Sequence, residues 1–300
     1  MASSLSPLPL AALPPLPPLQ LAVVGHVEVV TFLEVDHLPT AGEILSCPAA
    51  LDLPAGGGAV VAVQLARLTG RRVPFFTALG RDAIGERAAE QLERLGLELH
   101  VAWREQPTRR GITYSDRSGE RTITVIGERL NPAASDSLPW HRLGSCDGMF
   151  VTAADAPALQ RCRSARVLAA TPRLRLPVLR QAGVRLDALI GSALDPAEQL
   201  PAEALQPPPR LRIATAGGEG GEAWPLGRFE APPRQHPVRD AYGAGDSFAA
   251  GVTAGLAAGW TDAMAISLGC HCGNACLDGL GPYATQLRRT AAGDLSRQGD

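Results

Sequence analysis

Lysine is missing from this sequence: all 28 basic residues among its 300 residues are arginines. Without lysine the chain has no Walker-type phosphate loop, whose lysine reaches the β and γ phosphates of a nucleotide. Schiff-base chemistry through a lysine amine is excluded as well. The formal net charge is only −2, so we expect neither nucleic acid nor an anionic membrane surface as a partner.

Long apolar runs and ordered cysteine patterns are also missing. No hydrophobic run approaches the length that spans a bilayer, although hydrophobic residues make up 45% of the chain and suffice for a sizeable core. The six cysteines are too sparse and irregular for a secreted disulfide framework. We therefore expect a cytoplasmic protein with one large α/β domain or two ordinary ones.

Proline and leucine dominate the first 19 residues. This stretch lacks the basic segment of a signal sequence, and its prolines interrupt every helix that it could form. We interpret residues 1–19 as a disordered or polyproline-like extension, residues 20–290 as one domain and residues 291–300 as a polar C-terminal tail.

Short β-type runs alternate with helical patterns along the domain, which is typical of a parallel sheet covered on both faces. The clearest helix, at 82–95, has Asp82 as its N-cap and Gly96 after its end. Further helices are expected at 247–258 and 262–278. The predicted strands are 21–26, 72–78, 148–152, 166–170, 186–190 and 210–215.

Two segments break this alternation. Residues 27–38 and 110–126 are rich in β-branched side chains, and the second contains the turn sequence "SDRSG". We expect them to form a small β-sheet outside the main one.

The stretch "DAYGAGDSFAAG" at 240–251 places glycines directly before an apolar helix pattern. The backbone N–H groups of Gly243, Ala244 and Gly245 would point at a ligand in front of that helix, where the helix dipole also favours an anion. Asp246 is then placed to accept a proton from a hydroxyl that attacks a phosphoryl group. The alternative is that Asp246 only caps the helix and the glycines only make a tight turn.

This stretch resembles the C-terminal signature of the ribokinase-like (PfkB) carbohydrate kinases, D-T-x-G-A-G-D-x-F, with Ala241 in place of the threonine. Other stretches are similar to further motifs of the family, in the same order. They are the P-x-x-G-E pattern at Pro39, Gly42 and Glu43, the glycine-rich segment 54–70, the helix after "ALGRDAIG" and the loop "TAGGEGG" at 215–221. The resemblance spans about residues 21–285.

The resemblance implies a three-layer α/β/α sandwich with a mostly parallel sheet and a β-sheet lid built from about 27–50 and 108–126. It implies transfer of the γ-phosphoryl group of Mg-ATP to a hydroxyl of a small carbohydrate-like substrate. Asp246 would be the base, and the backbone of Gly243, Ala244 and Gly245 would stabilise the phosphoryl charge. Nucleotide-binding positions would be Thr215, Gly217, Gly220, Asp240, Cys270 and Asn274, although Asp240 is equally suited to holding the loop.

Magnesium dependence follows from the same resemblance. The family's N-x-x-E pattern, which acts on the metal through water, falls on Ser192 and Asp195, and Glu198 is a competing carboxylate. Cys270, Cys272 and Cys276 lie close together with a histidine, but on a helix their side chains point in different directions. We interpret them as core residues rather than metal ligands.

The sugar side departs from the family. Val30 and Val60 stand where these kinases commonly carry an Asp and an Asn for sugar hydroxyls, and valine offers neither a donor nor an acceptor. Glu28 either replaces the lost carboxylate or faces solvent on the lid. The candidate substrate residues are Glu28, Gly56, Gly57, Gly58 and Arg109, with Arg110 as a neighbour. The alternative for the glycines is a tight strand-to-helix turn. The alternative for the two arginines is a pair of solvated charges.

Three alternatives to a sugar kinase stay open: a nucleoside kinase, a phosphosugar kinase, and a nucleotide-binding regulatory protein that has lost turnover. Pairing of the lids would also allow a homodimer.

Overall fold

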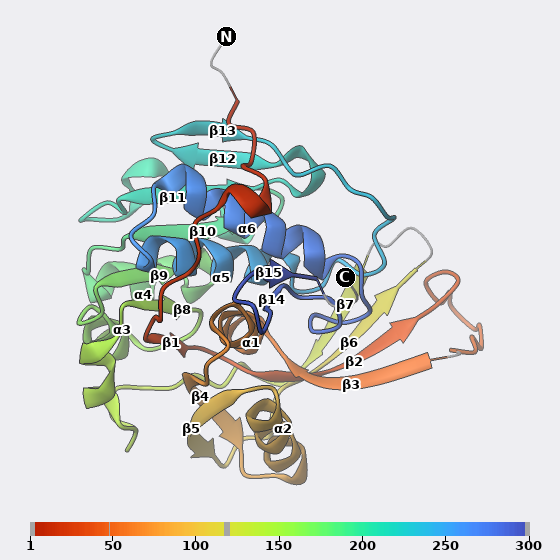
Figure 1. Ribbon diagram of the computed structural model, residues 1–300. Helices are drawn as coiled ribbons and strands as arrows, with labels where there is room; N and C mark the ends of the chain where they lie inside the picture. The colour runs from red at the N-terminus through yellow and green to blue at the C-terminus, as the bar shows by residue number, and fades with distance from the viewer. Residues whose placement is uncertain (1–3, 48, 117–120, 298–300) are drawn as a thin grey trace.

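A large, mostly parallel sheet forms the centre of the molecule (Figure 1). The computed structural model describes residues 4–47, 49–116 and 121–297. Within them the sheet consists of β1 (Leu21–Val24), β4 (Val73–Gly80), β5 (Leu97–Arg104), β8 (Gly148–Val151), β9 (Val167–Ala170), β10 (Ala188–Ser192), β11 (Leu211–Thr215), β12 (Gly221–Trp224) and β13 (Gly227–Phe229). The order is β13-β12-β11-β10-β9-β8-β1-β4-β5, and only β12 and β13 run antiparallel to their neighbours.

The apolar sequence of the inner strands explains why they lie in the middle of the sheet. In β1, Leu21 and Val23 belong to the core on one face, while Ala22 and Val24 belong to the core on the other. All four residues are buried, because successive side chains of a strand point to opposite faces and both faces are covered.

Helices cover both faces of the sheet and give the predicted three layers. The cores place α1, α5 and α6 on one face and α3 and α4 on the other, as Figure 1 shows. Their bounds, with that of α2 beside β5, are α1 (Gly57–Thr69), α2 (Ala83–Arg94), α3 (Ala156–Cys162), α4 (Leu176–Ala182), α5 (Ala244–Ala257) and α6 (Asp262–Cys276). Short 3₁₀ turns occupy Leu10–Ala12, Trp140–Ser145, Pro172–Leu174, Pro196–Glu198, Ala202–Ala204 and Gly217–Glu219.

The helix boundaries follow the capping residues. Asp82 accepts a hydrogen bond from the Gly85 N–H and caps α2 as predicted, and Thr261 caps α6 in the same way. Helix α5 begins three residues earlier than expected, at Ala244, because Gly243 adopts a left-handed backbone with φ of 81° and lets the chain enter the helix there.

A second, smaller sheet lies apart from the large one, as predicted for the lid. Its strands are β2 (Glu28–Glu34), β3 (Ala49–Ala55), β6 (Arg110–Ser115) and β7 (Arg121–Ile126), in the order β3-β2-β6-β7. The central pair β2 and β6 is parallel, and the outer pairs are antiparallel. Residues 117–119 of the expected "SDRSG" turn at 115–119 lie outside the described residues.

The N-terminal segment differs from the expected disordered extension. Leu5 exchanges backbone hydrogen bonds with Arg228 and Glu230 beside the edge strand β13, and the Leu8 N–H donates to the Ser267 hydroxyl of α6. Leu16 and Leu19 are buried in the core. Prolines prevent an α-helix here and leave a mostly extended chain, with one 3₁₀ turn, whose leucines can cover apolar surface.

The C-terminal tail also takes part in the fold. Two short strands, β14 (Arg288–Arg289) and β15 (Leu295–Ser296), pair with each other, and Leu295 packs against the core. In the part of the chain that the structure describes, no helix has the length and apolarity needed to cross a membrane.

Candidate active site

The residues singled out for nucleotide chemistry lie where the parallel strands end. The chain leaves β1 at Gly25, β8 at Thr152 and β9 at Thr171, and the N-terminus of α5 lies at the same end, since Asp246 lies against Gly57 and Thr152 lies beside Gly25. In open α/β sheets the ligand crevice lies outside the carboxyl ends of the strands. The predicted site therefore falls where this topology places binding sites.

The turn before α5 has the form of an anion site. Gly243 supplies the positive φ at the N-cap, and no side chain caps this helix. A Cβ added to Gly245 would meet no atom within 4 Å, so open space lies beside the first turn. The Ala244 N–H makes only a long hydrogen bond, of 3.5 Å, to the Ala241 carbonyl. A helix start without a side-chain cap, next to open space, fits a phosphoryl group.

Asp246 belongs to the first turn of α5 and lies against the glycine-rich segment. A Cβ on Gly57 would come within 2.8 Å of Asp246 Oδ1, so glycine is what lets the two segments approach. Burial raises the pKa of Asp246, the negative charges of Glu198 and Glu28 raise it further, and Arg173 opposes the rise. A carboxylate with a raised pKa is a stronger base than an exposed aspartate.

Asp240 was considered for nucleotide binding and for holding the loop, and its contacts are those of a loop-holding residue. Its side chain is fully buried. One carboxylate oxygen accepts the Tyr242 N–H at 2.9 Å, and the other accepts the Gly281 N–H at 2.9 Å. Asp240 thus fixes the turn that presents Gly243 and Asp246, and both of its oxygens already have partners in the protein.

The loop after β11 is a tight backbone turn. The Ala216 N–H donates to the Gly220 carbonyl at 2.8 Å, and the Thr215 hydroxyl donates to the Gly191 carbonyl at 3.3 Å. A Cβ on Gly220 would lie 2.0 Å from the Phe229 carbonyl oxygen, so only glycine fits. Gly217 has a positive φ.

A hollow of about 530 Å³ adjoins this loop and is lined by Ser4, Gly218, Glu219, Arg228, Phe229, Glu230 and Ala231.

Cys270 and Asn274, expected near the adenine, are buried on α6 beneath the chain that follows β13. The Cys270 thiol lies 3.8 Å from the Glu230 carbonyl, and Asn274 Oδ1 accepts a hydrogen bond from Arg234 at 2.9 Å. All six cysteines are free thiols. Cys270, Cys272 and Cys276 are buried, as expected for core residues. The residues that the structure describes contain no cluster of His, Cys, Asp or Glu able to hold a metal.

The two carboxylates considered for magnesium have different surroundings. Asp195 is half-buried, and its Oδ1 accepts the Ala197 N–H at 2.9 Å, which leaves the other oxygen for a ligand or water. Glu198 is buried and forms an ion pair with Arg173, while its Oε2 accepts the Ser192 N–H at 3.0 Å. Glu198 is therefore occupied within the protein, and Asp195 is the more accessible carboxylate.

Glu28 does not face solvent. It is buried at the base of the lid, with 8% of its surface exposed. Its Oε1 accepts a hydrogen bond from the Tyr242 hydroxyl at 3.1 Å, and its Oε2 lies 3.0 Å from Arg109 Nε in an ion pair. The Tyr242 hydroxyl in turn accepts the Gly56 N–H at 3.1 Å. This network joins the lid, the glycine-rich segment and the turn before α5.

The glycine-rich segment packs against protein backbone at Gly58, where an added Cβ would meet the His26 carbonyl at 2.7 Å. The two valines that replace polar family residues are fully buried. Val30 packs against Gly111 of the lid, and Val60 lies beneath Gly243. Arg110 is exposed. Of the adjacent arginines only Arg109 joins the candidate site, and both valine positions are used for packing.

The family model of the pfkB family carbohydrate kinases matches residues 19–183 and 184–287. The chain belongs to the pfkB family of carbohydrate kinases. A ribokinase of Arabidopsis thaliana is 30% identical over 111 residues, which cover 36% of this chain and only 29% of that relative's length.

Solved kinases share the fold. A microbiome-derived acarbose kinase aligns with a TM-score of 0.74 at 20% identity, covering 88% of this chain and 94% of its own. The Arabidopsis thaliana ribokinase, solved with ribose and ATP, aligns with a TM-score of 0.67 at 18% identity, with the same coverages. At these identities the likeness establishes the ribokinase-like fold of this pfkB kinase.

Sequence reasoning missed three residues around the site of this kinase: His26, Arg129 and Arg173. His26 is buried, and burial together with the positive charges of Arg129, Arg173 and Arg109 lowers its pKa well below the usual range, so the imidazole is neutral. His26 is the last residue of the predicted strand 21–26, and Arg173 lies three residues after the predicted strand 166–170. The rule that sites lie at the carboxyl ends of parallel strands would have directed attention to His26 and Arg173.

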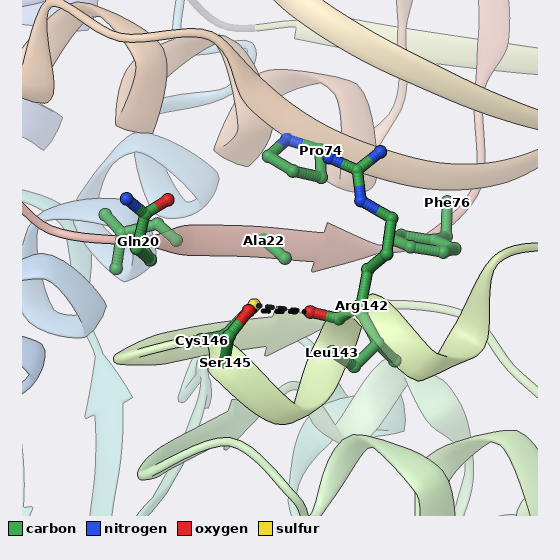
Figure 2. Close-up of a pocket in the computed structure, with 9 residues that line it drawn as sticks. Gln20, Ala22, Pro74, Phe76, Arg142, Leu143, Ser145 and Cys146 are labelled. Atoms are coloured by element: carbon green, nitrogen blue, oxygen red, sulfur yellow. Dashed lines mark hydrogen bonds between the residues drawn. The ribbon is translucent and has the colours of Figure 1, made fainter.

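A second hollow of this kinase, of about 60 Å³, lies where β1 begins (Figure 2). Its lining includes Gln20, Ala22 and Arg142. The Ser145 hydroxyl and the Cys146 thiol both donate to the Arg142 carbonyl, as the dashed lines show, and the Arg142 guanidinium pairs with Glu98. It lies at the end of β1 opposite to the candidate active site.

Proposed function

We propose that this pfkB kinase is an ATP-dependent phosphotransferase that moves the γ-phosphoryl group of Mg-ATP to a hydroxyl of a small carbohydrate-like substrate. The observation that carries the proposal is the position of Asp246: a carboxylate with a raised pKa beside an uncapped helix start that faces open space. Phosphoryl transfer needs positioning and charge stabilisation more than covalent chemistry by the protein, and this arrangement offers both.

In the proposed reaction the substrate oxygen attacks the γ-phosphorus while Asp246 accepts the hydroxyl proton. The bond between the γ-phosphorus and the bridging oxygen breaks, and ADP leaves with the electron pair. Backbone N–H groups of Gly243, Ala244 and Gly245 hold the transferred oxygens. Small residues at Thr215, Gly217 and Gly220 let the backbone approach the other phosphates, and Cys270 and Asn274 lie on the helix at that end.

Magnesium would neutralise phosphate charge when it is bound with the nucleotide. The residues fit an ion held mainly by phosphate and water, because Asp195 leaves one carboxylate oxygen unused while the described residues form no metal cage. The substrate hydroxyls would meet the Glu28 carboxylate, Arg109 and the backbone of Gly56, Gly57 and Gly58.

The test is a phosphorylation screen with Mg-ATP over free sugars, polyols, nucleosides and sugar phosphates, read by ADP release. We expect one class to be phosphorylated by the parent protein and not by Asp246→Asn. Nucleotide binding without turnover across all classes would replace the proposal with a regulatory role.

Arg129 favours a second candidate acceptor, a sugar that already carries an anionic group such as phosphate. Burial and the positive charge of Arg109 lower the pKa of Arg129. Among residues 4–47, 49–116 and 121–297, no carboxylate lies within ion-pair distance of it. An arginine keeps its charge in proteins, so an anionic substrate group would compensate it. Arg129→Gln would then raise the KM of sugar phosphates only.

The lid is the surface we propose for a homodimer. Strand β7 is an edge of the small sheet, all of its residues are exposed, and they include Ile123, Val125 and Ile126. An exposed apolar edge strand pairs readily with a second chain. Light scattering on the parent protein should give a dimer mass, and Val125→Glu should shift it toward the monomer; a monomeric parent at high concentration contradicts this proposal.

A further inference from the structure

A chain without lysine must stabilise the charge of a transferring phosphoryl group with another cation. Backbone N–H groups carry only partial charges, whereas the three oxygens of that group carry most of the charge in the transition state. Arginine is the only permanently cationic side chain available here. A guanidinium at the phosphoryl end of the site is therefore needed.

Arg173 has the position and the unused hydrogen-bond donors needed to stabilise the phosphoryl charge. It lies in the turn directly after β9, at the carboxyl end of the sheet. Its backbone is fixed from two sides: its N–H donates to the Thr171 hydroxyl at 3.3 Å, and its carbonyl accepts from Arg129 Nη1 at 3.3 Å. The side chain is thereby fixed at its base.

Glu198 then orients the guanidinium. Arg173 Nε donates to Glu198 Oε1, and Glu198 is held by the Ser192 N–H and lies against Gly191. Within the described ranges of the chain, neither Nη1 nor Nη2 of Arg173 has a hydrogen-bond acceptor. The side chain is 41% exposed. A guanidinium anchored through Nε presents its two terminal nitrogens as a fork, which matches two oxygens of a phosphoryl group.

The surrounding charges shift the pKa values of Arg173 and Arg129 in opposite directions. Burial acts to lower the pKa of Arg173, but the negative charges of Asp246 and then Glu198 raise it above the usual range. Burial and positive neighbours lower the pKa of Arg129 instead. Arg173 has the largest effect of any arginine on the pKa of the proposed base, and Arg121 adds a smaller one.

We infer that Arg173 contacts the transferring phosphoryl group and, in doing so, takes the part that a lysine or a second cation plays at other phosphoryl-transfer sites. The inference rests on the proposed phosphotransferase function. The reaction balances as before: the substrate oxygen bonds to the γ-phosphorus, Asp246 takes the proton, and ADP leaves. Arg173 forms hydrogen bonds to the transferred oxygens and exchanges no proton. Glu198 is a positioning residue that aims the guanidinium.

The first test compares ATP with ADP binding in the absence of acceptor. Because only ATP carries the γ-phosphoryl group, Arg173→Gln should weaken ATP binding about tenfold to a hundredfold more than ADP binding. Arg173→Lys should recover part of the difference, since a point charge remains but the fork is lost. Arg87→Gln, at an exposed arginine of α2, is the matched control and should leave both affinities unchanged. Equal weakening of ATP and ADP overturns the inference.

The second test separates catalysis from support of Glu198. If Arg173 only neutralises Glu198, the double variant Arg173→Gln/Glu198→Gln should recover most of the parental kcat. If Arg173 serves the phosphoryl group, the double variant should stay about 10³-fold slow, like Arg173→Gln alone, while Glu198→Gln alone has a smaller effect. Urea unfolding of each variant confirms that the comparison is made between folded proteins.

The pH dependence gives a third readout. Arg173 holds down the pKa of Asp246, so Arg173→Gln should move the acidic limb of kcat/KM to higher pH, whereas loss of a distant structural contact should not move it.

A parent protein that binds ATP but phosphorylates no acceptor refutes the proposed function while the ATP and ADP comparison still decides the role of Arg173. A parent that binds neither nucleotide refutes both.

Discussion

The proposed phosphoryl end and the proposed substrate end of this kinase are built by different means. At the phosphoryl end, a left-handed glycine, an uncapped helix start and a buried aspartate that fixes the turn produce a site made mostly of backbone. At the substrate end, charged and polar side chains are added to the backbone of the glycine-rich segment. Glu28 from the lid meets Tyr242, 214 residues away in the sequence, and Arg109, which directly precedes lid strand β6.

This difference explains why one end keeps the family pattern and the other departs from it. A backbone site needs glycine at particular positions, because added side chains would collide or force a strained conformation. A side-chain site can be rebuilt when a new carboxylate reaches the same space. Val30 and Val60 are fully buried and serve packing, while Glu28 brings a buried carboxylate to the base of the lid.

The largest expected effect is at the phosphoryl end. Asp246→Asn removes the proposed base and should lower kcat about 10²- to 10⁴-fold, the usual contribution of general-base catalysis, while ATP affinity changes little. Single-turnover phosphorylation with the acceptor found in the screen measures it. Turnover at the parental rate would show that another group is the base.

The same substitution should raise stability. Burial raises the pKa of Asp246 in the folded state, so between the unfolded and folded pKa values the folded protein binds more protons than the unfolded chain. Stability therefore falls as pH rises through that interval, and the penalty is complete above it. Asp246→Asn removes the penalty, and its melting temperature at pH 7 should exceed that of the parent; a lower value would contradict the raised pKa.

A smaller and different effect is expected at the substrate end. Glu28→Gln replaces a charged acceptor beside Arg109 and should raise the KM of the acceptor about tenfold, the size of a charged hydrogen bond, with a smaller change in kcat. Glu34→Gln, on the same strand but paired with Arg239 at the surface, is the control. If both variants leave KM unchanged, Glu28 is a structural residue of the lid.

The smallest effect is expected at the magnesium position. Asp195→Asn preserves the cap on Ala197 but removes the charge, so the Mg²⁺ concentration for half-maximal rate should rise only a few-fold, as expected for an ion reached through water. Glu203→Gln, at an exposed residue, serves as the control. Equal Mg²⁺ dependence in both variants would show that Asp195 does not act on the metal.

Residues 82–95 and 240–251 show how far sequence reasoning reaches. The cap at Asp82 and the glycine turn at Gly243 are local patterns, and both form as expected. The N-terminal segment shows the limit: it forms no α-helix and only a short 3₁₀ turn, but its composition cannot reveal that Leu16 and Leu19 find core partners supplied by distant parts of the chain.

The sequence by itself determined the parts that depend on neighbouring residues: the alternation of strands and helices, the glycine turn and Asp246 at its end. These depend on backbone conformation and side-chain periodicity, which a short stretch specifies. Only the tertiary structure decided which charges meet. Glu28 with Tyr242 and Arg109, and Arg173 with Glu198, are residues far apart in the chain that the fold brings together near the carboxyl ends of the parallel strands.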